Sequence, residues 1–292
     1  MHRLIRDLTA RVPVVTDGAW ATQLQARGLQ LGECAEAWNI THPDQVVQVG
    51  SAYVAAGSRV ILSNTFGGNR LALAKHGLAD RMADINRNGV QLSLAAANGK
   101  ACVFASVGPS GKMLMMNEVD ATELEEVFTG QVTVLAEAGA EGIVVETMID
   151  LEEAVIAASA ALRTGLPVVA CLVFDSGPQR DRTIMGVGPE EAAKALAGAG
   201  VDVIGANCGQ GIEGFVPLAS RLVKATSKPV WIKANAGLPQ VEGGQVAYHT
   251  TPAQFAASVP ALRDAGVGFI GGCCGTTPAY ISEVCRVLER SS

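Results

Sequence analysis

The sequence predicts a single (β/α)8 barrel, and three observations support that prediction. Apolar segments of strand length alternate with helix-like segments along the whole chain. A short Ala-Gly joint recurs between the end of a helix and the strand that follows it. Hydrophobic residues make up 49% of the chain but aromatic residues only 4%, which is typical of strands buried on both faces. A doubly wound open sheet is the alternative.

The strand candidates follow one another in a regular order. Four of them come shortly after the Ala-Gly joints at Gly57, Gly139, Gly200 and Gly266, because glycine just past a helix end can turn the chain into the next element. The predicted strands are Val12–Thr16, Arg59–Ser63, Cys102–Val107, Gly142–Glu146, Pro167–Val173, Val201–Ala206, Pro229–Lys233 and Gly268–Gly271. Helix starts fit between them where a proline occupies the first turn, at Pro43, Pro189, Pro252 and Pro278.

Length and composition limit the possible classes of protein. One barrel accommodates all 292 residues, and no linker divides them, so we expect one domain covering residues 1–292. A net charge of −6 argues against a nucleic-acid partner. The N-terminus carries several charges and does not read as a signal peptide, and no apolar run reaches the roughly 20 residues that span a bilayer. Seven cysteines without disulfide-like spacing favour the cytoplasm.

Polar residues gather where the predicted strands end, which is the rim that carries the chemistry in such barrels. They are Asp17, Asn64, Thr65, Glu146, Asn207, Cys208, Lys233, Asn235, Cys273 and Cys274.

The two adjacent cysteines of Gly272-Cys273-Cys274-Gly275 are the most informative of these. Neighbouring side chains in a strand point to opposite faces, so both sulfurs reach one ion only if the backbone leaves strand geometry, which glycines permit. Cys208 supplies a third sulfur, and zinc with three protein ligands keeps one position open for catalysis. A vicinal redox disulfide and a chance pair of core thiols are the alternatives.

Six motifs together resemble the homocysteine S-methyltransferase family, and most of all the homocysteine-binding module of cobalamin-dependent methionine synthases. They are Asp17–Leu24, Ser63–Gly67, Val144–Thr147, Gly205–Gly209, Lys233–Gly237 and Gly271–Pro278, in the family's order over nearly the whole chain. The resemblance implies a zinc-containing barrel that methylates homocysteine to methionine. It also implies that Cys208, Cys273 and Cys274 are the zinc ligands.

Other strand-end residues are expected to contact the substrate. Asp17 and Glu146 would hold its ammonium group, an assignment the resemblance supports most directly for Glu146, and the Gly18 and Ala19 amides would bind its carboxylate. Capping a loop or helix is the structural alternative for both carboxylates. Asn64, Thr65, Asn207 and Asn235 would orient the substrate or the thiolates, or only satisfy backbone groups. Lys233 would neutralise a carboxylate or extend to the surface.

The methyl donor is less well defined by the sequence. The chain ends at Ser292 and contains no Asp-x-His-x-x-Gly corrinoid-binding signature, so we expect an external donor. A separate methylcorrinoid protein or methylcobalamin is favoured, and S-methylmethionine or S-adenosylmethionine is the alternative. Betaine is disfavoured because quaternary ammonium groups usually need an aromatic cage. A homo-oligomer is compatible with the sequence.

Two departures from the family pattern leave the identity of the thiol open. Val49 stands where many relatives have histidine, and Leu62 stands where some methionine synthases have glutamate, so a related thiol is an alternative substrate. Two further readings belong to other classes: a non-catalytic zinc- or thiol-binding partner subunit, and a lyase or hydrolase that uses Glu146 as its base.

Overall fold

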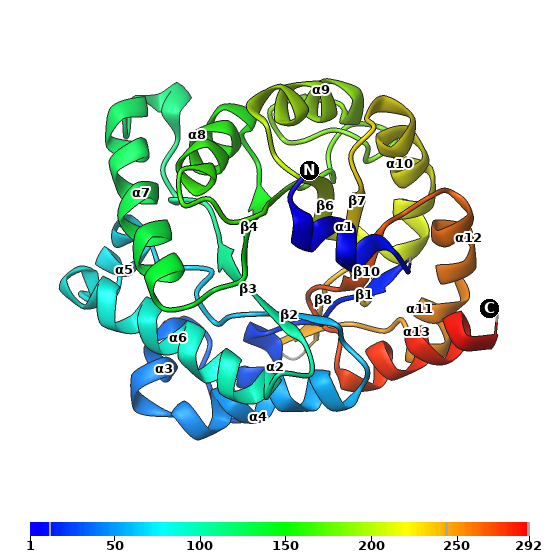
Figure 1. Cartoon of the computed structure of the whole chain (residues 1–292), viewed down its shortest axis with the longest axis horizontal. Coiled ribbons are helices and arrows are strands. Elements are labelled where there is room, and N and C mark those ends of the chain that lie inside the picture. Colours follow the sequence, from blue (N-terminus) through cyan, green and yellow to red (C-terminus); the bar gives the residue numbers. More distant parts are fainter. Residues whose placement is uncertain (12, 243–244, 291–292) are drawn as a thin grey trace.

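The computed structural model describes residues 1–11, 13–242 and 245–290, and within them eight parallel strands form a nearly closed barrel (Figure 1). The spatial order is β1-β10-β7-β6-β5-β4-β3-β2, and a bridge between Thr16 and Val60 connects the two ends. The predicted (β/α)8 barrel is confirmed. The strands are β1 (Val14–Val15), β2 (Val60–Leu62), β3 (Cys102–Val107), β4 (Gly142–Met148), β5 (Val168–Leu172), β6 (Val203–Gly211), β7 (Val230–Asn235) and β10 (Phe269–Gly272).

Helices follow the strands and surround the barrel (Figure 1). Four of them begin at the predicted prolines, and Thr251 adds a capping box with Gln254 before Pro252. They are α1 (Arg3–Thr9), α2 (Ala21–Gln25), α3 (Trp38–Thr41), α4 (Pro43–Ala55), α5 (Arg70–Ala74), α6 (Met82–Ala97), α7 (Ala121–Glu137), α8 (Leu151–Leu162), α9 (Pro189–Ala199), α10 (Ile212–Ala225), α11 (Pro252–Ala257), α12 (Val259–Asp264) and α13 (Pro278–Arg290).

The Ala-Gly joints behave as the sequence predicts. Gly57, Gly139, Gly200 and Gly266 all have positive φ, between 91° and 107°. A side chain with a Cβ is strained in this region, so glycine allows each helix to end and the chain to enter the barrel within a few residues.

The strand boundaries differ from the prediction in places. β6 continues to Gly211 instead of ending at Ala206, because a register shift after Asn207 lets Gly211 pair with Asn235 of β7. β1 is short, and Val12 at the start of its predicted range lies outside the described residues. A separate antiparallel hairpin, β8 (Gln240–Glu242) with β9 (Gln245–Ala247), follows β7.

The core has two layers that hold the site in place. The outer faces of the strands pack against the helices, and the barrel interior is filled by Trp231, Phe104 and Phe269, whose rings contact one another. Helix α1 lies across one end of the barrel and buries Ile5 and Leu8 against this interior cluster (Figure 1). The chemistry is therefore confined to the opposite end, where the strands terminate.

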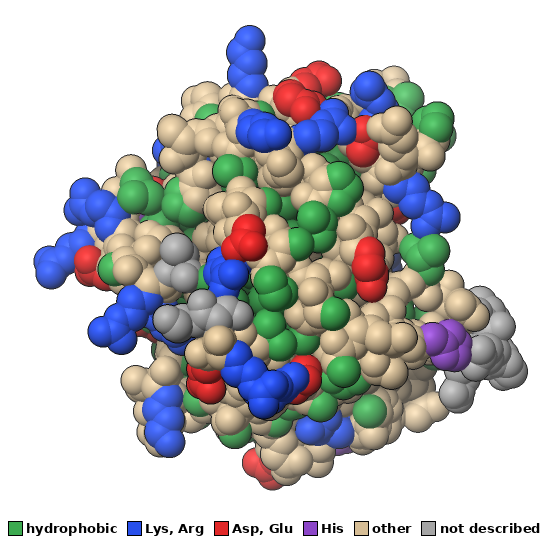
Figure 2. Space-filling view, turned by 90° about the vertical axis from the view of Figure 1, so that its right-hand side faces the viewer, with side chains coloured by type: hydrophobic (Ala, Val, Ile, Leu, Met, Phe, Trp, Pro, Cys, Tyr) green, Lys and Arg blue, Asp and Glu red, His purple; other side chains and the backbone are tan. Residues whose placement is uncertain are grey.

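Positive and negative side chains are interspersed with hydrophobic ones on the face shown in Figure 2. Among the described residues, no helix has both the length and the apolar character needed to cross a membrane.

Candidate metal centre and substrate cavity

Three cysteines that are distant in the sequence meet at the ends of β6 and β10. Both strands pair with β7, and Asn207 and Gly271 are in register with the same residue, Lys233. Cys208 follows Asn207 directly, and Cys273 and Cys274 follow the last residue of β10. Barrel pairing therefore brings the sulfurs of Cys208, Cys273 and Cys274 within 4.8 Å of one another.

The local backbone turns these thiols toward one point. Cys208 has φ +62°, a left-handed conformation that costs a residue with a Cβ about 1–2 kcal/mol. Strand β10 ends at Gly272, so the cysteine pair lies in a turn, as the sequence predicts. A Cβ at Gly272 would lie 2.3 Å from Thr276 Oγ1, which shows how closely the turn folds back on itself.

The geometry and chemistry of the three thiols fit a zinc ion. Tetrahedral zinc with bonds of about 2.3 Å places its sulfur ligands about 3.8 Å apart, and Cys208 Sγ lies 3.9 Å from Cys274 Sγ. Hydrogen bonds from Cys273 and Cys274 lower the pKa of Cys208 to about 3, so the cluster can already carry negative charge. Asn235, beside Cys208, has a buried side-chain oxygen without a hydrogen-bond partner in the described structure, as expected of a group that a cation would satisfy.

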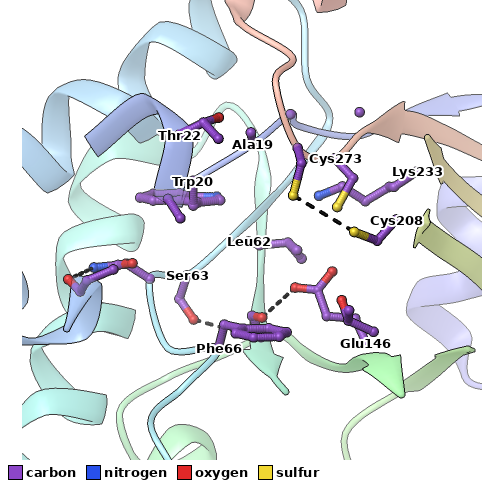
Figure 3. A pocket seen from close by; sticks show the side chains of 18 of the residues that line it. Ala19, Trp20, Thr22, Leu62, Ser63, Phe66, Glu146, Cys208, Lys233 and Cys273 are labelled. Atoms are coloured by element: carbon purple, nitrogen blue, oxygen red, sulfur yellow. Dashed lines mark hydrogen bonds between the residues drawn. The ribbon is translucent and has the colours of Figure 1, made fainter. Parts of the chain in front are cut away.

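Glu146 lines the cavity close to Cys208 (Figure 3). A register shift in β4 and a φ of +61° at Thr147 interrupt the regular pleat beside it. One Glu146 oxygen accepts a hydrogen bond of 2.5 Å from Ser106 Oγ, and the other accepts one of 3.4 Å from Asn207 Nδ2. Burial raises the pKa of Glu146, and the opposing effects of Lys233 and Ser106 are smaller.

Asn207 connects the carboxylate to the thiols. Its side-chain amide accepts from the Thr147 backbone N–H at 2.8 Å and donates to Thr147 Oγ1 at 2.7 Å. The same amide nitrogen lies 3.4 Å from Glu146 Oε2 and 3.8 Å from Cys273 Sγ. Asn207 thereby fixes the strained end of β4 relative to the thiol cluster.

Asp17 is held by groups of the protein itself. It is fully buried and accepts hydrogen bonds from Lys233 Nζ at 2.5 Å, from Trp20 Nε1 at 2.7 Å and from the Leu62 backbone N–H at 2.7 Å. Lys233 is only 2% exposed, so its side chain points inward to a carboxylate and does not extend to the surface. Burial opposes its charge, but the nearby carboxylates of Asp17 and Glu146 outweigh burial and raise its pKa.

A cavity of about 310 Å³ opens beside the thiols (Figure 3). Of the predicted substrate contacts, Gly18, Ala19, Asn64 and Glu146 line it. Asp17, Thr65, Asn207 and Asn235 are buried and bond to other protein groups; Thr65 Oγ1, for example, donates to the Ser106 carbonyl at 2.8 Å. The Ala19 amide donates to Thr276 Oγ1 at 3.1 Å, so it is engaged within the protein.

Other residues that line the cavity received no role from the sequence. Trp20 and Phe66 belong to the strand-end motifs Asp17–Leu24 and Ser63–Gly67. Their place in these motifs could have predicted that they line the cavity. Glu36 gives no such signal, because it lies outside the six motifs and reaches the cavity by accepting a hydrogen bond of 2.7 Å from the Gly67 amide. The remaining lining residues without a predicted role are Ala21, Thr22, Ala35, Leu62, Ser63, Ser106, Thr147 and Gly272.

A parallel (β/α)8 barrel with three convergent thiols and a buried carboxylate at its strand ends belongs to the class of barrels whose rim could hold a metal ion. The chain belongs to the homocysteine S-methyltransferase family, whose model matches residues 14–288.

Curated relatives support the same family, and a solved structure supports the fold. The chain is 30% identical over 301 residues to methionine synthase from Mycobacterium tuberculosis and 29% identical over 303 residues to that from Mycobacterium leprae. These matches cover 97% and 98% of the chain but 25% of each relative, so the chain spans about a quarter of their length. The metallated homocysteine methyltransferase MmuM from Escherichia coli has the same fold, with a TM-score of 0.80, 22% identity and coverage of 96% of this chain and 98% of MmuM.

Proposed function

We propose that this protein transfers a methyl group to the thiol of homocysteine, forming methionine, with zinc held by Cys208, Cys273 and Cys274. The observation that carries the proposal is the cluster of three sulfurs within 4.8 Å of one another at the wall of a cavity that also contains a buried carboxylate. Family membership supports homocysteine methylation, and the donor set supports the metal. The proposal treats residues 1–292 as one catalytic domain, in a reducing cytoplasm where the thiols stay free.

Glu146 is the residue that binds the substrate ammonium group in this proposal. Its carboxylate lines the cavity. Its hydrogen-bond donors, Ser106 and Asn207, are both uncharged, so the negative charge of the carboxylate is available to a cationic substrate group. Asp17 contributes indirectly. It forms an ion pair with Lys233, and its hydrogen bonds from Trp20 and Leu62 fix the backbone next to Gly18. Gly18 lines the cavity, and in this proposal its backbone N–H binds the substrate carboxylate.

Zinc, when bound, lowers the pKa of the substrate thiol and keeps its sulfur nucleophilic at neutral pH. The substrate sulfur then uses one electron pair to form the new S–CH3 bond. The bond between the methyl group and the donor breaks, and its electron pair stays on the donor. Glu146, which Asn207 helps to position, holds the amino acid so that its sulfur points at the incoming methyl group.

We infer that the donor is external and favour a methylcorrinoid protein or methylcobalamin over a small sulfonium such as S-methylmethionine or S-adenosylmethionine. Similarity to methionine synthases supports the corrinoid donor. Leu62 lines the cavity with an apolar side chain, and a related thiol remains the alternative acceptor.

The test is to incubate zinc-loaded protein with homocysteine and, in parallel, methylcobalamin, S-methylmethionine or S-adenosylmethionine, and to assay methionine. Product with methylcobalamin supports the full proposal, and product only with a sulfonium contradicts the choice of donor. Failure with all three contradicts homocysteine methylation. Cys208→Ser distinguishes catalysis from docking, because methyl transfer needs all three sulfurs whereas a docking subunit would still bind its partner.

A further inference from the structure

The loop that follows β2 forms one wall of the cavity that contains Glu146. Within Ser63–Gly68, three residues line that cavity: Ser63, Asn64 and Phe66 (Figure 3). The loop contains no helix or strand, and its one large apolar side chain, Phe66, is 38% exposed. Neither a regular hydrogen-bond ladder nor a buried apolar anchor fixes its position, so other contacts must do so.

Three buried side-chain amides hold the loop from behind. They belong to Asn39 of α3, Asn86 of α6 and Gln131 of α7, are at most 2% exposed and lie outside the cavity lining. Each donates a hydrogen bond of 2.7 to 2.9 Å to a different carbonyl of the loop: Asn39 to Asn64, Gln131 to Thr65 and Asn86 to Gly68. The fit is close, because a Cβ at Gly68 would lie 2.4 Å from Asn86 Oδ1 and 2.9 Å from Gln131 Nε2.

The loop dictates how two of these amides are oriented. A carbonyl oxygen only accepts hydrogen bonds, so Thr65 and Gly68 require the NH2 ends of Gln131 and Asn86. The Asn86 oxygen accepts from Gln131 Nε2 at 3.1 Å, whereas the Gln131 oxygen is buried without a hydrogen-bond partner in the described part of the chain. An unpaired buried acceptor costs stability, so stability is given up here for a fixed position of the Thr65 carbonyl.

The same loop connects the three amides to Glu146. Thr65 Oγ1 donates to the Ser106 carbonyl at 2.8 Å, and the Ser106 hydroxyl donates to Glu146 at 2.5 Å. A shift of Thr65 would therefore move the donor that orients the carboxylate. A shift of Phe66 would change the cavity wall.

We propose that Asn39, Asn86 and Gln131 are positioning residues for the binding of the amino-acid acceptor, an inference that rests on the proposed function. They fix the loop, and the loop fixes both the cavity wall and the contact between Ser106 and Glu146. Displacing the loop should therefore weaken homocysteine binding. Zinc binding should stay unchanged, because in the described structure these amides bond to the loop and not to the thiols.

Gly89→Ala tests the inference by moving the loop without weakening a helix. Gly89 lies within α6, and alanine is more favourable than glycine in a helix interior. An added Cβ would lie 2.6 Å from Thr65 Cγ2 and 2.7 Å from Asn39 Nδ2, closer than van der Waals contact allows, and 3.2 Å from the Asn64 carbonyl oxygen. The new methyl group should therefore push the loop away from α6.

Gly130→Ala is the matched control. Gly130 is also a helical glycine and directly precedes Gln131, but an added Cβ there would meet only Met82 Cε, at an ordinary 3.6 Å. A second variant, Gln131→Met, removes the amide with little change of volume. Its control is Val132→Ala, which removes buried apolar atoms from the same helix but no hydrogen bond to the loop.

Two measurements follow the variants. Calorimetry with zinc-loaded protein gives the affinity for homocysteine, and hydrogen exchange of the peptide that covers the loop gives its order without any substrate. We expect Gly89→Ala and Gln131→Met to weaken homocysteine binding about tenfold, to speed exchange of the loop amides and to keep the wild-type zinc content. Gly130→Ala and Val132→Ala should retain the wild-type affinity and the wild-type exchange of the loop.

Wild-type homocysteine affinity in folded Gly89→Ala and Gln131→Met would overturn the inference and leave the proposed function intact. Equal losses of affinity in the two control variants would also overturn it, because the effect would then belong to helix packing in general. Wild-type protein that neither binds nor methylates homocysteine would refute the proposed function. In that case unchanged exchange of the loop amides in Gly89→Ala and Gln131→Met would separately refute the positioning of the loop.

Discussion

The two sides of the barrel mouth each carry a buried carboxylate, but they use it differently. On the β1 and β7 side, Asp17 accepts three hydrogen bonds from the protein and forms an ion pair with Lys233. On the β4 and β6 side, Glu146 accepts only neutral donors, faces the cavity and has a raised pKa caused mainly by burial. One carboxylate is already neutralised within the fold, and the other is left for a cationic partner.

This difference shows that a strand-end carboxylate is not by itself a substrate-binding group. Both residues lie at the end of a predicted buried strand: Asp17 follows Val12–Thr16, and Glu146 is the last residue of Gly142–Glu146. What separates them is the cation of Lys233, which lies 2.5 Å from Asp17 Oδ1 and has no such contact with Glu146 in the described structure. The predictions below use this contrast, beginning with the largest expected effect.

Asp17→Ala should destabilise the protein by about 3–5 kcal/mol, because it leaves the Lys233 ammonium buried without its partner. The free energy of unfolding from urea titration measures the loss. The double variant Asp17→Leu with Lys233→Met should recover most of it, since apolar side chains then replace both charges. A loss below about 1 kcal/mol in the single variant would show that the pair contributes no more than a surface ion pair.

Glu146→Gln should leave the fold intact and weaken homocysteine binding by about 1.5–3 kcal/mol, or about ten- to hundredfold in KM. The amide keeps the shape of the side chain but removes the charge that attracts the ammonium group. Steady-state kinetics with homocysteine measures the change. The control substrate is 4-mercaptobutyrate, which lacks the amino group: wild type and variant should use it equally poorly, and a further loss in the variant would contradict ammonium binding by Glu146.

The existence and order of the strands could be predicted from local patterns in the sequence, and the convergence of the cysteines follows only once the strands close into a barrel. Ala-Gly joints locate strand starts, and parallel strands place their C-terminal ends on one rim. The partner of Asp17 could not be predicted in this way, since Lys233 is 216 residues away and its inward orientation depends on packing. Glu36 was missed for a similar reason: it lies in a short 3-10 helix, Ala35–Ala37, and its partner Gly67 is 31 residues away.

The positive φ values of Cys208 and Thr147 also escape sequence analysis. Neither residue type favours this conformation, so it must be imposed by surrounding contacts. Asn207 supplies two of these contacts by bonding both the backbone N–H and the hydroxyl of Thr147. The part of the barrel mouth that carries the candidate site is therefore the part where surrounding contacts override the backbone preferences of individual residues.

Asn207→Leu should reduce zinc affinity by about tenfold, a smaller effect than either carboxylate variant. The substitution removes the side chain that links Glu146 and Thr147 to Cys273, while the sulfurs themselves remain. Competition with a chromogenic chelator measures the affinity. Asn64→Leu is the matched control, because Asn64 is a buried asparagine at another strand end that bonds to Ala35 and Asn39. Equal zinc loss in both variants would indicate a general packing defect.

The smallest expected effect is a pH dependence of stability that comes from Glu146. The pKa of Glu146 is raised in the folded protein from its ordinary 4.5, so the folded state binds a proton more readily than the unfolded state. The unfolding free energy of wild type relative to Glu146→Gln should therefore fall as pH rises from about 4.5 through the raised pKa, and then level off. Homocysteine affinity should rise over the same interval, because only the ionised carboxylate attracts the ammonium group. Urea titrations of both zinc-loaded proteins at several pH values measure the stability difference, and a difference that stays flat or increases with pH would contradict a raised pKa of Glu146.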